Sequence, residues 1–349
     1  MKKVFIFGTF PSPLGGTSIH VYRLFNLLKS IYDVKGIDTY GTANKPHEGI
    51  ESVTNYKKFL LKFFLTYSFD LIHSHTHSWN ERLILCVLTK LRFKKIIFTF
   101  HSLREDLDEM SIFNRAKIKL VSILGDVFVV PNLVIKKKLI EFGVYNEKIV
   151  IIPTLILPDD KMKNKLDPRV DGFLTDNDIL ISCNASNNNL YKGDDLYGLD
   201  IYIDLCEKFK ANEKIKFLYC VTKITDKFRF ENQMNRVKDL NLENKLFILN
   251  DEIDFIPVLK RSSVFIRPTC YDSYGISVGE AIHLKIPAIA SDVCTRTQGA
   301  ILFKNRDLDD LYLKLSNVLE DPCFYKEKLN QVSLTDNSSD MLKLYNKVL

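Results

Sequence analysis

This 349-residue chain lacks the features that would mark it as a membrane-spanning or secreted protein. It has no long uncharged apolar stretch that could cross a bilayer. The first apolar run, directly after the N-terminus, holds only about five residues, which is too few for a secretory signal. The seven cysteines are scattered and never spaced as C-x-x-C, so they indicate neither a disulfide framework nor a zinc site. We therefore expect a cytoplasmic protein with reduced thiols.

Two common nucleotide-binding fingerprints are also missing. No G-x-G-x-x-G run and no Walker lysine follows the first predicted strand, which argues against a dinucleotide-dependent oxidoreductase and against an ATPase. A glycine pair, Gly15-Gly16, does stand between that strand and the next helix. Such a pair lets the backbone approach a ligand and offers amides to phosphate, although strand-to-helix junctions also use glycine for steric reasons alone.

Positive charge is concentrated in the N-terminal half. Residues 1–155 carry 22 Lys and Arg against 13 Asp and Glu, whereas residues 156–349 carry 27 against 30. This asymmetry predicts an anionic neighbour, either a membrane surface or a phosphate-bearing substrate, and we expect no nucleic acid. The candidate stretches are 57–64, 90–95 and 136–138. The first mixes lysines with large apolar residues, which fits an interfacial amphipathic helix and equally an ordinary surface helix with its apolar stripe in the core.

Short apolar runs alternate with longer helical patterns, which predicts parallel βαβ units and an α/β fold. The alternation occurs twice, on either side of a polar, proline-containing break at 153–178. We predict two doubly wound domains, residues 1–157 with a C-terminal helix at 337–349, and residues 158–336. The predicted strands are 4–7, 71–73, 96–100, 127–130 and 149–152, then 179–182, 217–221, 246–248, 264–266 and 288–290.

The segment 264–292 is the most informative part of the chain. Its strand runs into a loop with Pro and Gly, and a helix is predicted from Ile276. Asp272 and Glu280 are eight residues apart, so one continuous helix would turn them roughly 80° from each other. We therefore place Asp272 in the loop and Glu280 one turn inside the helix. The amides of 275–277 then form a helix end suited to a diphosphate, and the two carboxylates can accept hydrogen bonds from sugar hydroxyls.

This segment resembles the Glu-x7-Glu signature of the family 4 retaining glycosyltransferases, with Asp272 in place of the first Glu. The flanking runs 267–269 and 287–292 are also similar to that family, particularly to members that build bacterial surface polysaccharides. The resemblance implies the GT-B fold, in which two Rossmann-like domains face a cleft. It further implies that Asp272 contacts the donor sugar and Glu280 the nucleotide ribose. The residues implied in diphosphate binding are Tyr274, Gly275, Ile276 and Ser277.

The same resemblance assigns roles outside this segment. The family has a Gly-Gly loop that touches donor phosphate and acceptor, and Gly15 and Gly16 correspond to it. It often has a histidine at the end of the strand that corresponds to 96–100, which implies His101 as a catalytic candidate in contact with the donor sugar or acceptor. A histidine that merely caps the strand is the alternative. Retaining enzymes of this fold are usually thought to react on one face of the sugar, and this scheme requires no metal.

One part of the family pattern is missing. The family has an Arg and a Lys-Gly pair after the first strand of the second domain, where they neutralise the donor diphosphate. Matching the following helix puts Tyr197-Gly198 at the Lys-Gly position, and no Arg remains. Lys192, within an insertion, or Lys223 is the expected replacement. Without such a cation the diphosphate would bind more weakly, because preplaced positive charge is usually the largest contribution to leaving-group stabilisation.

Three histidines, His73, His75 and His77, alternate along one stretch and would share one face of an extended chain. Zinc is conceivable there, but no Cys or carboxylate completes a tetrahedral set nearby. A strand end beside a cleft more often uses such groups for hydrogen bonds. We therefore expect no metal, and we place His73 and His75 on the acceptor side.

Together these patterns predict a retaining glycosyltransferase. Its donor would be a UDP- or GDP-linked sugar, with no other cofactor, and its acceptor a glycan or a lipid-linked molecule. We expect it to act in O-antigen or capsule synthesis, at the inner face of the cytoplasmic membrane. Two alternatives stay open. The missing Arg and Lys-Gly pair would suit a non-catalytic partner subunit of the same fold, and a sugar-nucleotide epimerase would use the same nucleotide groove without an acceptor.

Overall fold

The computed structural model describes residues 1–40, 47–158, 165–334 and 336–349. The chain divides into two compact units. Unit 1 comprises Met1–Pro13, Thr17–Ile156 and Asp336–Leu349, and unit 2 comprises Leu14–Gly16 and Leu157–Thr335. Part of the polar break expected from the sequence, residues 159–164, lies outside the described residues.

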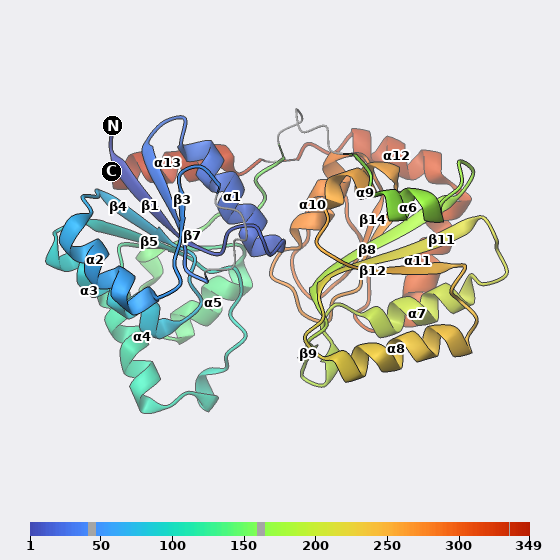
Figure 1. The fold of residues 1–349 in the computed structure, drawn as a ribbon, viewed down its shortest axis with the longest axis horizontal. Coiled ribbons are helices and arrows are strands. Elements are labelled where there is room, and N and C mark those ends of the chain that lie inside the picture. Colours follow the sequence, from blue (N-terminus) through green and yellow to red (C-terminus); the bar gives the residue numbers. More distant parts are fainter. Residues whose placement is uncertain (41–46, 159–164, 335) are drawn as a thin grey trace. The chain divides into compact units, whose positions relative to one another are not determined.

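Unit 1 is built on a seven-stranded parallel sheet in the order β3-β2-β1-β4-β5-β6-β7 (Figure 1). Its strands are β1 Lys3–Gly8, β2 Asp33–Asp38, β3 Ile50–Ser52, β4 Leu71–Ser74, β5 Lys95–Thr99, β6 Val127–Val130 and β7 Ile149–Ile151. Its helices are α1 Gly16–Leu28, α2 Tyr56–Thr66, α3 Trp79–Leu91, α4 Ile112–Leu124, α5 Leu133–Glu141 and α13 Ser338–Val348.

Alternating side chains of these strands enter two separate cores. Phe5 and Phe7 of β1 pack with Phe63 of α2 in edge-to-face contacts, with ring centroids 5.0 and 5.3 Å apart. Val4 and Ile6 point to the other face, where α1 and the C-terminal helix α13 cover them. The period of two along β1 therefore decides which helices each residue meets.

Unit 2 is built on a six-stranded parallel sheet in the order β12-β11-β8-β13-β14-β15. Its strands are β8 Ile179–Asn187, β11 Ile215–Lys223, β12 Leu246–Asn250, β13 Val264–Arg267, β14 Ala288–Ser291 and β15 Ile301–Phe303, and β9 Leu190–Tyr191 pairs with β10 Asp194–Asp195 as a separate hairpin. Its helices are α6 Pro168–Phe173, α7 Leu199–Lys208, α8 Lys227–Asp239, α9 Phe255–Arg261, α10 Ile276–His283, α11 Leu308–Glu320 and α12 Pro322–Asn330.

Several helices of unit 2 begin where an aspartate can cap them. The side chains of Asp226, Asp254 and Asp307 each accept a hydrogen bond from an amide in the first turn of α8, α9 and α11. These caps satisfy amides that have no partner within the helix. Helices α7, α8 and α11 lie on one side of the sheet, and α6, α9 and α10 lie on the other (Figure 1).

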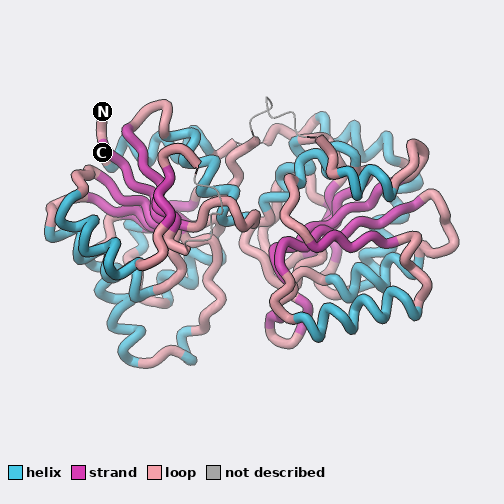
Figure 2. The backbone as a smooth tube through the Cα atoms, viewed as in Figure 1, coloured by secondary structure: helices cyan, strands magenta, loops and turns pink. Residues whose placement is uncertain are grey.

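The two sheets share one topology, visible as a fan of strands within each unit (Figure 2). Counted within its own unit, each runs 3-2-1-4-5-6 in its first six strands, the doubly wound order. The order reverses between β1 and β4 in unit 1 and between β8 and β13 in unit 2. Ligands of such sheets bind at the carboxyl ends of the strands beside that reversal. The α/β class and the Rossmann-like form of both domains, predicted from the sequence, are confirmed.

The structure adds strands that the sequence pattern did not indicate: β2, β3, β15 and the hairpin β9–β10. Among the described residues, no helix combines the length and the apolar character needed to cross a bilayer. All seven cysteines are free thiols, as expected.

Candidate functional site

In unit 2, the loop from Pro268 to Gly275 joins β13 to α10 at the carboxyl edge of the sheet, beside the reversal of strand order. As the sequence predicts, Asp272 lies in this loop and α10 begins at Ile276. Glu280 lies one turn inside α10 and is buried, with 3% of its surface exposed. The first amides of α10 therefore end at this edge, with the two acids on either side along the chain.

Gly275 is required at the start of α10. Its φ of +81° lies in the left-handed region, and a Cβ atom there would be 2.6 Å from Nη1 of Arg296 and 3.2 Å from Oδ2 of Asp272. Any side chain would thus strain the backbone and push against an ion pair. The absence of a side chain lets the open helix end lie directly beside these charges.

Asp272 is held between two arginines. Its Oδ2 lies 2.8 Å from Nη1 of Arg296 and 3.1 Å from Nε of Arg267. Its Oδ1 accepts a hydrogen bond from the amide of Ser273 at 3.0 Å. Burial by itself would raise the pKa of Asp272, but the two guanidinium groups outweigh it and hold that pKa well below its usual range. Asp272 is therefore paired with two guanidinium groups at once.

Arg296 is bound entirely by the protein. Its Nε donates to the carbonyl of Ser291, and its Nη2 donates to the hydroxyls of Thr269 and Ser291, at 3.0 to 3.1 Å. Its Nη1 donates to Asp272 at 2.8 Å and to the carbonyl of Tyr274 at 3.4 Å. These bonds occupy all five N–H groups that a guanidinium carries. Arg296 therefore positions the loop, and sequence analysis missed it because it lies beyond the motif.

Arg267, the last residue of β13, is bound less completely. Its Nη1 donates to the backbone and side-chain oxygens of Asn184 on β8, at 3.0 and 3.2 Å, and its guanidinium lies 5.1 Å from the centre of the Tyr197 ring. No described residue accepts a hydrogen bond from its Nη2 group. The side chain of Asn184 also donates to Ser277 in the first turn of α10, at 2.9 Å. Asn184 thus links Arg267 to the first turn of α10.

The missing Lys-Gly pair has a structural counterpart. Tyr197 stands at the expected lysine position and stacks against Arg267. Gly198 follows it with φ of +71°, where a Cβ atom would come within 2.3 Å of the carbonyl oxygen of Pro268. Gly198 is therefore needed for close packing, and the nearby guanidinium belongs to Arg267 of β13. The two strands involved, β8 and β13, are neighbours in the sheet.

The two lysines predicted to replace that pair lie on exposed segments. Lys192 occupies the turn of the β9–β10 hairpin, and Lys223 is the last residue of β11. The hairpin approaches the loop, because the rings of Tyr191 and Tyr271 lie 4.6 Å apart. The insertion expected around Lys192 is this hairpin. Phosphate contact by either lysine stays a prediction.

The glycine pair after β1 belongs to unit 2. A Cβ atom on Gly15 would lie 3.6 Å from Ser186, and one on Gly16 would lie 3.9 Å from Ile276 at the start of α10. The carbonyl oxygen of Leu14 accepts a hydrogen bond from the hydroxyl of Thr222 at 3.1 Å. Gly16 thus lies beside the first residue of α10, and phosphate contact by Gly15 and Gly16 stays a prediction.

In unit 1, four buried histidines gather at the carboxyl edge of the sheet: His73 and His75 from β4 and its following loop, His101 after β5, and His20 from α1. His73 makes two hydrogen bonds, 2.6 Å from the hydroxyl of Tyr345 and 2.7 Å from that of Thr99. Both ring nitrogens of His73 are thereby used within the core. An acceptor-side role for His73 stays a prediction.

Burial lowers the pKa of each of these histidines. The pKa of His20 falls to about 4 and that of His73 to about 3, and the pKa values of His75 and His101 fall well below the ordinary range. Neighbouring histidines and arginines depress them further, because two cations close together repel. All four rings are therefore neutral at pH 7. His20 was not identified from the sequence, since a single histidine inside a helix gives no pattern.

A cavity of about 410 Å³ in unit 1 lies elsewhere, at the amino ends of β1 and β2, where Lys3, Lys35 and Lys62 line it. Ligands of doubly wound sheets gather at the opposite edge. The loop before α10 in unit 2 is therefore a better candidate for the functional site than this cavity.

Two family models match the chain: Glycosyltransferase Family 4 over residues 14–159 and Glycosyl transferases group 1 over residues 195–321. The chain belongs to these glycosyltransferases. A comparison of this glycosyltransferase with curated protein sequences finds no match.

The fold of this glycosyltransferase is similar to solved structures along its whole length. It matches a glycosyltransferase from Rickettsia africae with 16% identity, covering 99% of this chain and 98% of that one, at a TM-score of 0.74. Sucrose-phosphate synthase from Thermosynechococcus elongatus matches with 16% identity, 99% of both chains and a TM-score of 0.73. Anabaena HepE in complex with UDP matches with 14% identity, 98% of this chain, 94% of that one and a TM-score of 0.72. The predicted GT-B fold is confirmed.

Proposed function

We propose that this glycosyltransferase moves a sugar from a nucleoside-diphosphate donor to a hydroxyl of a glycan or lipid-linked acceptor, with retention of anomeric configuration, in surface polysaccharide synthesis. Unit 2 binds the donor, and unit 1 carries the acceptor side. The observation that carries this proposal is the guanidinium of Arg267, which contacts Asp272 and also Asn184, the residue that donates to Ser277 in the first turn of α10.

The roles within the donor site follow from these contacts. The diphosphate accepts hydrogen bonds from Nη2 of Arg267 and from the first amides of α10, where the helix dipole also favours negative charge. Gly15 and Gly16 let the backbone approach the same group. Oδ1 of Asp272 accepts from a hydroxyl of the sugar, since a carboxylate oxygen can take a second hydrogen bond. Glu280 accepts from the ribose.

The donor is a uridine nucleotide in this proposal. Three solved structures of Anabaena HepE, at 13–14% identity, contain UDP, UDP with glucose, or UDP-glucose. The diphosphate site needs no metal, because Arg267 and the helix end supply the positive charge that a divalent cation would otherwise bring. Arg267 supports turnover over the partner-subunit alternative, because that alternative rested on a missing cation.

Contact with an anionic membrane surface is proposed for α2. Phe59, Leu60 and Phe63 point into the core, as an ordinary surface helix requires. Leu61 and Leu65 remain 64% and 68% exposed, and 57, 58 and 62 on the exposed side are lysines. Lysine heads beside apolar side chains suit a lipid headgroup layer.

The other basic stretches are weaker candidates for membrane contact. Lys90 and Lys95 pair with Asp126 at 2.6 and 3.3 Å, and Lys94 pairs with Asp70 at 3.1 Å. Two carboxylates therefore offset part of the positive charge of the stretch 90–95. A carboxylate so close to each ammonium reduces what the stretch can offer to an anionic surface.

The direct test is calorimetric titration of UDP, GDP and UDP-glucose into the wild type and into Arg267→Gln. Hydrogen bonds to charged groups contribute about 1.5–3 kcal/mol, so Arg267→Gln should weaken UDP binding by about 10- to 100-fold. Arg236→Gln is the matched control, because Arg236 forms a half-exposed ion pair with Asp204 on the outer helices of the same unit. It should bind UDP like the wild type.

Each outcome has a defined meaning. A wild type that binds none of these nucleotides would overturn the donor site and favour the partner subunit. Equal loss in Arg267→Gln and Arg236→Gln would remove the specific role of Arg267. Incubation with UDP-glucose and no acceptor tests the epimerase alternative. An epimerase would change the configuration of the sugar, whereas a transferase would leave UDP-glucose unchanged.

A further inference from the structure

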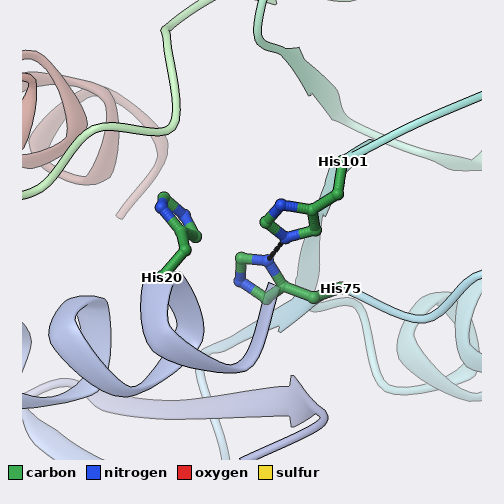
Figure 3. A group of neighbouring side chains, drawn as sticks. All are labelled: His20, His75 and His101. Atoms are coloured by element: carbon green, nitrogen blue, oxygen red, sulfur yellow. Dashed lines mark hydrogen bonds between the residues drawn. The ribbon is translucent and has the colours of Figure 1, made fainter. Parts of the chain in front are cut away.

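Three of the buried histidines of unit 1 surround one point. His20 comes from α1, His75 from the loop after β4 and His101 from the end of β5, and the rings face one another (Figure 3). One potential ligand nitrogen from each ring lies within 4.8 Å of the other two. The rings of His20 and His101 have centroids 5.1 Å apart, and those of His75 and His101 are 5.2 Å apart. Each comes from a different secondary-structure element, so the fold itself assembles the group.

The hydrogen bonding of His20 fixes its tautomer. Its Nδ1 lies 2.7 Å from the carbonyl oxygen of Thr154. A carbonyl can only accept, so Nδ1 carries the proton and Nε2 carries a lone pair. That Nε2 atom is buried and has no hydrogen-bond partner among the described residues. A backbone carbonyl behind one ring nitrogen is the arrangement that orients histidine ligands in metal sites.

His75 presents a second unpaired nitrogen. Its Nδ1 lies 2.9 Å from Nε2 of His101, and its Nε2 is buried without a partner among the described residues. A neutral imidazole carries one proton, so a single N–H serves the contact between these two rings, and coordination of one ion by both rings has to replace that contact. An unpaired buried polar atom is costly, and two of them beside each other call for a common partner. A cation that accepts lone pairs would satisfy both.

The chemistry of the group selects the class of ion. Three imidazoles suit the divalent first-row transition metals, and none suits Mg²⁺ or Ca²⁺, which prefer oxygen. Zn²⁺ binds imidazole nitrogen at about 2.0–2.1 Å, so tetrahedral ligand atoms lie about 3.3 Å apart. The histidine rings must rotate inward to reach this spacing from a separation of up to 4.8 Å. Rotation of an imidazole about its ring torsion is soft.

We propose that His20, His75 and His101 bind one divalent transition-metal ion, with Zn²⁺ as the best fit, and that a solvent oxygen completes a four-coordinate shell. The set differs from the alternating histidines that the sequence suggested, because His20 and His101 take the places of His73 and His77. It assigns His101 to the metal in place of the substrate contact implied by the family resemblance. The ion holds α1 to β4 and β5 within unit 1.

The three histidines all belong to unit 1, and the metal proposal does not depend on the proposed function. His101 is the most accessible of the three, at 8% exposed, and the other two are at 1%. Neutral rings, which burial maintains at pH 7, are the form that coordinates metal. An ion would enter on the side of His101.

The test uses the full chain without an affinity tag, stripped with a chelator and then supplied with Zn²⁺ or Co²⁺. We expect one equivalent of Zn²⁺ per chain after gel filtration, measured by elemental analysis. With Co²⁺ we expect the strong visible absorption of a four-coordinate ion. His20→Gln, His75→Gln and His101→Gln should each weaken binding by more than tenfold. His47→Gln, which changes a histidine of the same unit outside the cluster, should bind like the wild type.

Several results would overturn the proposal. Wild-type protein that retains less than stoichiometric metal and shows no cobalt spectrum has no such site, whatever the variants do. Equal binding by the wild type and the three variants would place the metal elsewhere. If a variant fails to fold, competition with a chromogenic chelator still measures the Zn²⁺ affinity of the folded wild type. Metal-stripped, denatured His47→Gln gives the reference affinity of an unfolded chain. A wild-type affinity no tighter than this reference would count against the site.

Discussion

Both units have polar side chains where the strand order of the sheet reverses, but these side chains are neutral in unit 1 and charged in unit 2. In unit 1, four histidines meet where the strand order reverses, and burial keeps them neutral. In unit 2, Asp272 and two arginines meet at the corresponding point and stay charged, because each has an opposite partner within 3.1 Å. One sheet order thus provides the place for a site, and the local balance between burial and ion pairing determines its chemistry.

This difference predicts how much stability a substitution costs in each unit. A neutral imidazole that loses a partner leaves one unsatisfied nitrogen. A buried guanidinium that loses its carboxylate leaves a charge in a medium of low dielectric constant, which is far more costly. The carboxyl edge of unit 2 should therefore be more sensitive to single substitutions than that of unit 1.

The largest effect is expected from Asp272→Ala. This substitution leaves Arg267 and Arg296 as uncompensated buried cations, and breaking such a pair costs about 3–5 kcal/mol of unfolding free energy. Urea unfolding of the two-unit chain, followed by probes in each unit, measures it. Asp204→Ala is the control, because its pair with Arg236 is half-exposed and should contribute about 1 kcal/mol or less.

Low pH should reduce the difference in unfolding free energy between the wild type and Asp272→Ala. The pKa of Asp272 is depressed in the folded state, so its stabilising contribution is present above the unfolded value of about 3.9 and is lost as pH falls toward the folded value. The gap between the wild type and Asp272→Ala should narrow below about pH 4. A gap independent of pH would mean that the substitution acts through packing and not through charge.

Gly275→Ala should have the next largest effect. The left-handed backbone costs a residue with a Cβ about 1–2 kcal/mol, and displacement of Arg296 adds to that cost. Gly143 in unit 1 gives a matched control, since its φ is +90° but a Cβ there would meet nothing within 4 Å. We expect Gly275→Ala to destabilise the protein at least twice as much as Gly143→Ala and to weaken UDP binding. Equal losses of stability in Gly275→Ala and Gly143→Ala would show that Arg296 moves away from the new Cβ atom at no cost.

The predictability of these two regions from sequence also differs. The loop and start of α10 were located correctly because their signals are local: a proline, a glycine and two acids within one short segment. Arg296 and His20 were missed because their partners are distant in sequence, 24 residues away for Asp272 and 134 for Thr154. Such contacts exist only once the sheet has formed, so no periodicity along the chain could reveal them.

The missed strand β2 shows the same limit at the level of the fold. Its sequence has few apolar residues and contains Gly36, and a glycine normally weakens a strand. In the structure a Cβ atom on Gly36 would lie 2.7 Å from the ring of Phe10. The glycine therefore makes room for an aromatic ring that covers β2 from another part of the chain. A local pattern cannot distinguish this use of glycine from a turn.

The smallest effect is expected in the neutral network of unit 1. Tyr345→Phe removes the hydroxyl that lies 2.6 Å from His73 and leaves one buried nitrogen unpaired, which costs about 1–2 kcal/mol. Tyr32→Phe is the control, because its hydroxyl donates to Asn346 in a partly buried position and should contribute less. Thermal or urea unfolding of unit 1 measures both. A Tyr345→Phe loss as large as that of Asp272→Ala would contradict the comparison, because it would mean that neutral hydrogen bonds and buried charges constrain the two sheets equally.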